Sequence, residues 1–132
     1  MMPTPRPLSP HLQIYRLTLT MVVSGVHRLS GLALSAGAFV AVLWLIALGR
    51  GPAAYGDLVR ALRSAPGLLI VAALIVSFWF HLSSGIRHLI WDTGHALERR
   101  EARRGAALVV LAALLGSALT LVVVAHRMWG GA

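Results

Sequence analysis

Three long runs of apolar residues, separated by shorter polar stretches, make up most of this chain of 132 residues. The runs cover about residues 20–48, 66–93 and 106–125. Each core is near the roughly 20 residues that an α-helix needs to cross about 30 Å of hydrocarbon. The pattern therefore predicts an all-α membrane protein whose transmembrane domain, residues 20–128, holds three helices.

The polar stretches predict how these helices are flanked and joined. Residues 1–19 contain four prolines, and because proline fixes φ and lacks an N–H donor, we expect an extended N-terminal arm at the membrane surface. A cleaved signal peptide is the alternative, but the apolar run that follows is longer than a signal's apolar region and two more spans come later. Residues 49–65 predict a linker with one short surface helix, residues 95–104 a charged connector, and residues 129–132 a tail.

Composition supports the membrane assignment and excludes several functions. Of the residues, 58% are hydrophobic and 12% are charged, whereas a soluble domain has roughly 25% charged residues. All 12 basic residues are arginine, against 4 acidic residues. These arginines cluster between the apolar runs, where lipid headgroups explain them without a nucleic-acid partner. The chain has no cysteine, which excludes disulfides, thiolate metal sites and cysteine catalysis.

The arginine distribution also predicts an orientation. Six arginines lie in the arm and the second connector, and four lie on the opposite side of the predicted spans. Since positive charge is enriched on the cytoplasmic side, this bias favours a multi-pass protein of the inner (cytoplasmic) membrane with a cytoplasmic N-terminus.

A polar stripe runs along the end of the second span. An α-helix turns about 100° per residue, so positions i, i+4, i+7 and i+11 fall within roughly 40° of one another. In the second span this spacing holds for His81, Gly85, His88 and Asp92. Ionisable groups in a membrane helix cost about 2.5–3.5 kcal/mol each on insertion scales, so they normally face a protein interior and serve a function. We therefore expect the chemistry of this chain on that stripe.

The same spacing recurs at the start of the first span, beside His27, in Ser24, Arg28, Gly31 and Ser35. The small residues of this stripe can instead serve only to let another helix approach closely, and this packing interpretation stays open. Because consecutive spans are antiparallel, the start of the first span and the end of the second lie at the same membrane face. Two sets of residues should therefore meet at one depth: Ser24, His27 and Arg28 from the first span, and Arg87, His88 and Asp92 from the second.

A haem is the first chemistry that this arrangement could support. His81 precedes Asp92 by three helical turns, hence lies about 16 Å deeper, near the middle of the bilayer. A neutral imidazole there can ligate haem iron. Suitable partners for the haem propionates lie one to two turns nearer the surface, namely His27, Arg28, Arg87 and His88.

A quinone site is the second possibility, because Ser24 and Arg28 could bind a quinone carbonyl and Asp92, with an arginine partner, could supply protons. Two other interpretations remain at this point: a haem-free structural anchor with a hydrogen-bonded histidine, and an intramembrane proton pathway through Arg28, His88 and Asp92. An enzyme complete in this chain is not expected, since its soluble part is too small to hold an active domain.

Three motifs, taken as a set, carry a family resemblance. They are Arg6-Pro7-Leu8-Ser9-Pro10-His11-Leu12-x-Ile14-Tyr15, Ser24-x-x-His27-Arg28-x-Ser30-Gly31 and His81-x-x-x-Gly85-Ile86-Arg87-His88-x-x-Trp91-Asp92. The set closely resembles the larger cytochrome b membrane-anchor subunit of succinate dehydrogenase, respiratory complex II. It covers the arm and two of the three spans, in order.

The resemblance implies an anchor that pairs with a second, smaller three-helix anchor subunit and holds an iron-sulfur subunit and a flavoprotein subunit at the cytoplasmic face. It implies that His81 is an axial ligand of haem b, shared with the second anchor, and that His27 and His88 lie near the propionates. It places the quinone at Ser24 and Arg28. Electrons from succinate would pass from the flavoprotein through the iron-sulfur clusters to quinone.

Overall fold

The computed structural model describes residues 15–130 of the chain. These residues contain no strand and four α-helices: α1 (Leu19–Arg50), α2 (Pro52–Arg63), α3 (Ala65–Asp92) and α4 (Arg99–Trp129). α1, α3 and α4 are each long and apolar enough to cross a membrane. The predicted all-α membrane protein with three spanning helices is therefore confirmed. The predicted arm and tail lie largely outside the described residues.

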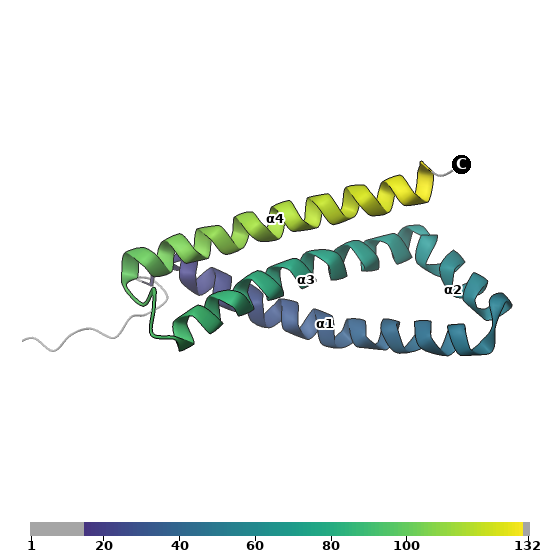
Figure 1. The fold of residues 1–132 in the computed structure, drawn as a ribbon, viewed down its shortest axis with the longest axis horizontal. Coiled ribbons are helices and arrows are strands. Elements are labelled where there is room, and N and C mark those ends of the chain that lie inside the picture. The colour runs from purple at the N-terminus through teal and green to yellow at the C-terminus, as the bar shows by residue number, and fades with distance from the viewer. Residues whose placement is uncertain (1–14, 131–132) are drawn as a thin grey trace, which may run out of the picture.

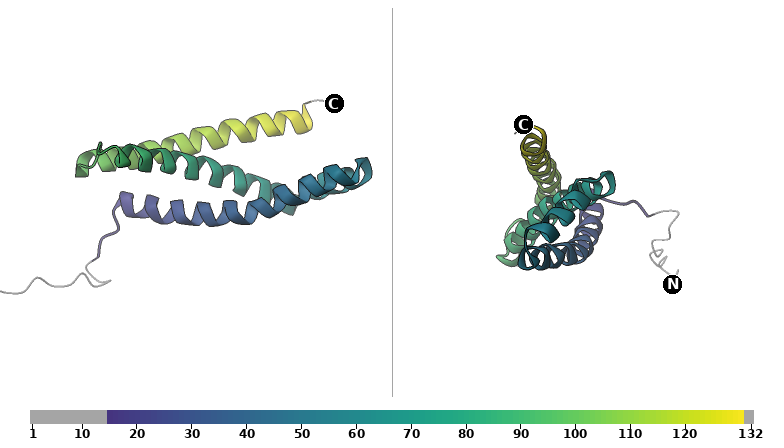
Figure 2. Two further views of the ribbon diagram at one scale, coloured as in Figure 1. Left: turned by 60° about the horizontal axis from the view of Figure 1, so that its bottom comes forward. Right: turned by 90° about the vertical axis from the view of Figure 1, so that its right-hand side faces the viewer.

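The three long helices lie side by side, with α3 between α1 and α4 (Figure 1). The start of α1, the end of α3 and the start of α4 gather at one end of the molecule, and α2 joins α1 to α3 at the other end. Figures 1 and 2 show that the C-terminal half of α4 diverges from α1. The antiparallel order brings the polar start of α1 beside the polar end of α3, as expected.

Local chemistry explains where the helices begin and end. α1 ends at Gly51, whose φ of 95° is a left-handed conformation that glycine adopts without strain. α2 then begins with Pro52, and it is the short helix predicted for the linker. The side chain of Ser64 caps α3 by accepting a hydrogen bond from the N–H of Gly67 at 3.3 Å. These junctions fix a tight turn from α1 through α2 into α3.

α4 begins earlier than the sequence pattern indicates. The prediction of a connector over residues 95–104 is wrong from Arg99 onward, because Arg99–Arg104 form the first turns of α4. Arginine, glutamate and alanine are good helix formers, and these charged turns extend beyond the apolar run. Hydropathy marks only the part of a helix that can lie in hydrocarbon, so it places the start of the helix too late.

The interior of the chain is small. One cluster of buried side chains joins α1 to α4, formed by Val23, Ala106 and Val109, with Phe80 and Val110 packed against it. Most large apolar side chains lie outside, for example Phe39, which is 73% exposed. Such a surface suits lipid or further helices, since hydrocarbon is as apolar as a leucine side chain.

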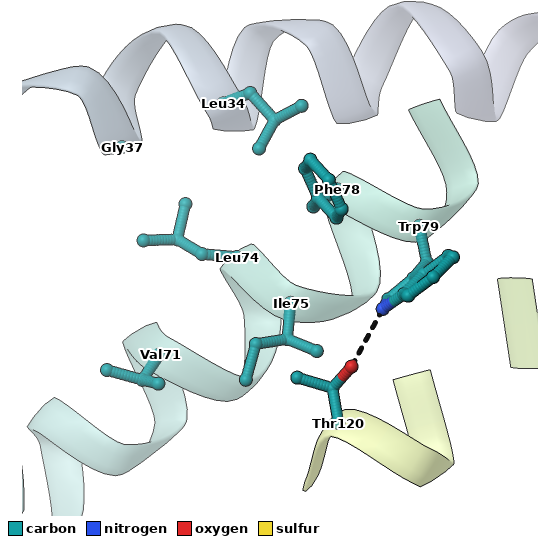
Figure 3. A pocket seen from close by; sticks show the side chains of 8 residues that line it. All are labelled: Leu34, Gly37, Val71, Leu74, Ile75, Phe78, Trp79 and Thr120. Carbon is teal, nitrogen blue, oxygen red and sulfur yellow. Dashed lines mark hydrogen bonds between the residues drawn. The ribbon is translucent and has the colours of Figure 1, made fainter. Parts of the chain in front are cut away.

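An apolar pocket of about 390 Å³ lies between α1, α3 and α4 (Figure 3). Leu34 from α1 and Phe78 from α3 line it, and Trp79 closes one side by donating a hydrogen bond to Thr120 Oγ of α4 at 2.9 Å. None of its lining residues is ionisable. This pocket belongs to the packing of the three helices, and the polar chemistry lies elsewhere.

Candidate functional site

Three imidazole rings meet between α1 and α3. The ring centroid of His27, on α1, lies 4.4 Å from that of His81 and 5.0 Å from that of His88, both on α3. His27 therefore contacts two histidines that stand two helical turns apart. The predicted meeting of the start of the first span with the end of the second is confirmed for His27 and His88.

Hydrogen bonds hold two of these rings by Nδ1. Nδ1 of His81 lies 3.3 Å from Ser30 Oγ and 3.3 Å from the backbone carbonyl oxygen of His27, so both of its partners belong to α1. Nδ1 of His88 lies 2.8 Å from the carbonyl oxygen of Ser84, one turn earlier on its own helix. The ring of His81 is thus fixed across two helices.

Some ring nitrogens of the cluster have no hydrogen-bond partner within residues 15–130. Nε2 of His27 is buried without a hydrogen-bond partner, and Nε2 of His81 makes no hydrogen bond within residues 15–130. Gly31 leaves space beside His81, because a Cβ at that position would lie 3.0 Å from His81 Cε1. No group of three histidine or acidic side chains in the described chain could hold a bare metal ion. One imidazole of this chain could serve as a haem ligand if a partner supplied the other, and His81, whose Nε2 makes no hydrogen bond within residues 15–130, suits that role.

Ser24 and Arg28 line a separate hollow of about 380 Å³, with Trp91 of α3 on the facing side. Ser30 and Ser35 donate their hydroxyl protons to carbonyl oxygens of α1. The hydroxyl of Ser24 makes no such bond within the part of the chain that the structure describes, and neither does the guanidinium of Arg28. Both groups are therefore free to bind something that enters the hollow.

Arg87 lies apart from the imidazoles. Its side chain is 6% exposed, donates to the carbonyl oxygen of Ala102 in α4 at 3.2 Å, and places Cζ 4.0 Å from the ring centroid of Trp91. Within residues 15–130 Arg87 makes no hydrogen bond to His27, which the sequence placed in the same group, because the Arg87 guanidinium lies against α4.

Asp92 has no arginine partner within residues 15–130, although the sequence suggested one. It is the last residue of α3 and is exposed, and within residues 15–130 the one ion pair joins Asp57 to Arg60. A carboxylate at a helix end can be solvated by water, so it needs no buried partner.

The sequence interpretation gave no role to two residues that the structure places in the site. Ser30 contacts His81, and its position three residues after His27 was the available signal, since i and i+3 share a helix face. Trp91 contacts His88, with ring centroids 5.2 Å apart, and also stacks on Arg87 and lines the hollow beside Ser24. Trp91 therefore connects the imidazole group with the hollow.

Comparison with known proteins gives the family. The family model for succinate dehydrogenase/fumarate reductase transmembrane subunits matches residues 2–122. The chain is 37% identical over 118 residues to the succinate dehydrogenase cytochrome b556 subunit of Paracoccus denitrificans, covering 89% of this chain and 91% of that protein. It is 37% identical over 114 residues to the mitochondrial succinate dehydrogenase cytochrome b560 subunit of Homo sapiens, covering 85% of this chain and 68% of that protein. The chain therefore belongs to the succinate dehydrogenase/fumarate reductase transmembrane subunit family, as a cytochrome b anchor subunit of complex II.

Proposed function

We propose that this anchor supplies one axial ligand of haem b, His81, and part of the site at which succinate:quinone oxidoreductase reduces quinone. The observation that carries the proposal is the cluster of His27, His81 and His88 inside two membrane-spanning helices. Uncharged imidazoles in hydrocarbon are costly unless they bind a partner. The printed names of the relatives, which are cytochrome b subunits, support a haem as that partner.

In this proposal His81 would hold the iron through Nε2, and His27, His88 and Arg28 would bind the propionates. Arg87, which the sequence also assigned to the propionates, has its guanidinium against α4 and would have to bind a propionate from that side. A bound haem supplies one-electron redox chemistry. The protein's own contribution is to hold the His81 ring and to exclude water from it.

The quinone would lie in the hollow beside Trp91. The free hydroxyl of Ser24 would donate a hydrogen bond to a quinone carbonyl oxygen, and the Arg28 guanidinium would stabilise the negative charge that develops there on reduction. Asp92, exposed at the same end of α3, can take up protons from water and pass them toward the reduced oxygen. Electrons would arrive from the iron-sulfur subunit.

The proposed assembly contains a second, smaller anchor subunit, an iron-sulfur subunit and a flavoprotein subunit, in the inner (cytoplasmic) membrane with the N-terminus of this chain on the cytoplasmic side. The second anchor would supply the other axial ligand. The largely exposed apolar faces of α1, α3 and α4 support a partner within the membrane. This chain would have no activity alone.

Replacing His81 by leucine tests the haem assignment. In the purified complex we expect His81→Leu to abolish or strongly alter the reduced-minus-oxidised haem b spectrum, because a six-coordinate iron loses one ligand. The matched control is His95→Leu, which changes an exposed histidine outside the cluster and should keep the spectrum. Succinate oxidation with an artificial dye reports that the complex has assembled. An unchanged haem spectrum in assembled His81→Leu would remove His81 as ligand and favour a haem-free anchor or a proton pathway.

A further inference from the structure

We infer that Ser30 is a positioning residue for His81: it fixes the tautomer and the orientation of the ring, so that Nε2 carries a free lone pair. This inference rests on the proposed function of His81 as a haem ligand. It concerns a residue that does not itself touch the iron.

Counting protons in the Ser30 network gives the tautomer. Ser30 has one hydroxyl proton, and its Oγ lies 2.7 Å from the carbonyl oxygen of His27, which can only accept. The hydroxyl proton is therefore used in that bond, and Oγ offers only lone pairs to its other neighbour. That neighbour is Nδ1 of His81, at 3.3 Å from Oγ and 3.3 Å from the same carbonyl oxygen. Both groups facing Nδ1 are acceptors, so Nδ1 must carry the proton of the neutral ring.

The opposite tautomer is disfavoured by the same contacts. An unprotonated Nδ1 would direct its lone pair at two oxygen lone pairs, and Ser30 is 5% exposed, which leaves little room for water to mediate. Because a neutral imidazole carries one N–H, protonation of Nδ1 leaves Nε2 as the unprotonated nitrogen that a metal requires.

The orientation of the ring is fixed by adjacent positions of α1. Ser30 and the carbonyl of His27 hold Nδ1, and the backbone at Gly31 lies against Cε1, since a Cβ there would approach it to 3.0 Å. His88 lacks such a link, because its Nδ1 partner is a carbonyl of its own helix. Within residues 15–130, His81 is therefore the histidine of the cluster whose ring, on α3, is hydrogen-bonded to a side chain of α1.

A hydrogen bond from Nδ1–H to an acceptor makes the imidazole a stronger electron donor, which stabilises ferric over ferrous iron and lowers the midpoint potential. Ser30→Ala removes one of the two acceptors and leaves the His27 carbonyl. We therefore expect Ser30→Ala to keep haem, to raise its midpoint potential, and to weaken haem retention by about tenfold, the lower end of the range for such outer contacts.

The experiment is a potentiometric titration of haem b in the purified complex, together with haem loss to an acceptor protein. Ser30→Thr keeps a hydroxyl at the same place and should return the potential to the wild-type value. Ser35→Ala is the matched control, because Ser35 is an exposed serine of the same helix whose one side-chain hydrogen bond within residues 15–130 goes to the carbonyl oxygen of Gly31. The readouts are the potential and the haem content, so they do not depend on turnover.

The outcomes separate this inference from the proposed function. A raised potential in Ser30→Ala, with wild-type values in Ser30→Thr and Ser35→Ala, supports the positioning role. If His81→Leu loses haem but Ser30→Ala titrates like Ser35→Ala, the role of Ser30 is refuted and the ligand assignment stands. If Ser30→Ala fails to assemble, the same titration is made on Ser30→Cys, whose sulfur is a weak acceptor: a raised potential there supports the inference, and the wild-type potential refutes it. An unchanged haem in His81→Leu refutes the proposed function itself.

Discussion

Replacing Ser24 by alanine removes one hydroxyl from the hollow beside Trp91 and should slow quinone reduction selectively. Ser24 is partly exposed and makes no hydrogen bond within residues 15–130, so its loss breaks no internal contact that the structure shows. A neutral hydrogen bond to a quinone is worth about 0.5–1.5 kcal/mol, and one to an oxygen that gains charge about 1.5–3 kcal/mol. Since 1.36 kcal/mol corresponds to about a factor of ten in rate, we expect a loss of about tenfold or more.

Arg28→Leu should be more severe than Ser24→Ala. It removes a charge that would stabilise the reduced oxygen, and no acidic side chain within the described chain pairs with Arg28 that would be left without its partner. We therefore expect both variants to assemble with haem and to oxidise succinate normally with a dye that takes electrons before the membrane.

The assay is the ratio of quinone-linked to dye-linked turnover in the same preparation. Ser35→Ala is the control, because its hydroxyl also lies on α1 but bonds to the helix itself. A ratio in Ser24→Ala equal to that of wild type would refute the assignment. The packing interpretation of the small residues on α1 would then be preferred, and the quinone would have to be placed at Asp92 and the partner subunit.

Three further predictions concern assembly and stability. Expressed without partner subunits, the chain should aggregate and bind haem poorly in detergent, because its imidazoles need a partner; a soluble, haem-loaded lone chain with a bis-imidazole spectrum would contradict this. Gly116→Val should destabilise the complex by about 1–3 kcal/mol, because even a Cβ at this position would overlap the Trp79 ring, and a thermal melt of the purified complex measures this. Arg87→Ala should lower the same melting temperature, through about 2 kcal/mol lost with the bond to Ala102, and an unchanged melt would show that the contact between α3 and α4 does not depend on it.

The long apolar runs predicted the spanning helices well, because a lone helix in hydrocarbon must satisfy its own backbone and must be long enough to cross. The start of α4 was predicted too late, since hydropathy does not detect the charged turns from Arg99 onward. The short helix α2 was foreseen from the linker, but its bounds required the turn at Gly51 and the cap at Ser64.

The sequence predicted that His27 and His88 lie together, but it did not predict the rotation of α1. The stripe through Ser24 and Arg28 looked like the interior face, whereas the structure turns His27 and Ser30 toward His81 and leaves Arg28 exposed. In a soluble protein an apolar stripe would show which face is buried, but lipid accepts apolar residues on every side. The angle about the helix axis depends on close packing with α3, which a single sequence does not record.

The distribution of side-chain size has a consequence for how this chain can diverge in evolution. Large aliphatic residues cover its outside, where leucine, isoleucine and valine are interchangeable against hydrocarbon, whereas most of the buried residues in the described chain are small or polar, such as Ala106, Ala113 and Ser84. Random drift can therefore exchange most of the apolar residues for one another while the helices keep their packing. The identity of 37% to the Paracoccus denitrificans subunit over 89% of the chain agrees with this. Selection for the fold should act most strongly at glycines such as Gly37 and Gly116, where one added methyl group would collide with a side chain of a neighbouring helix.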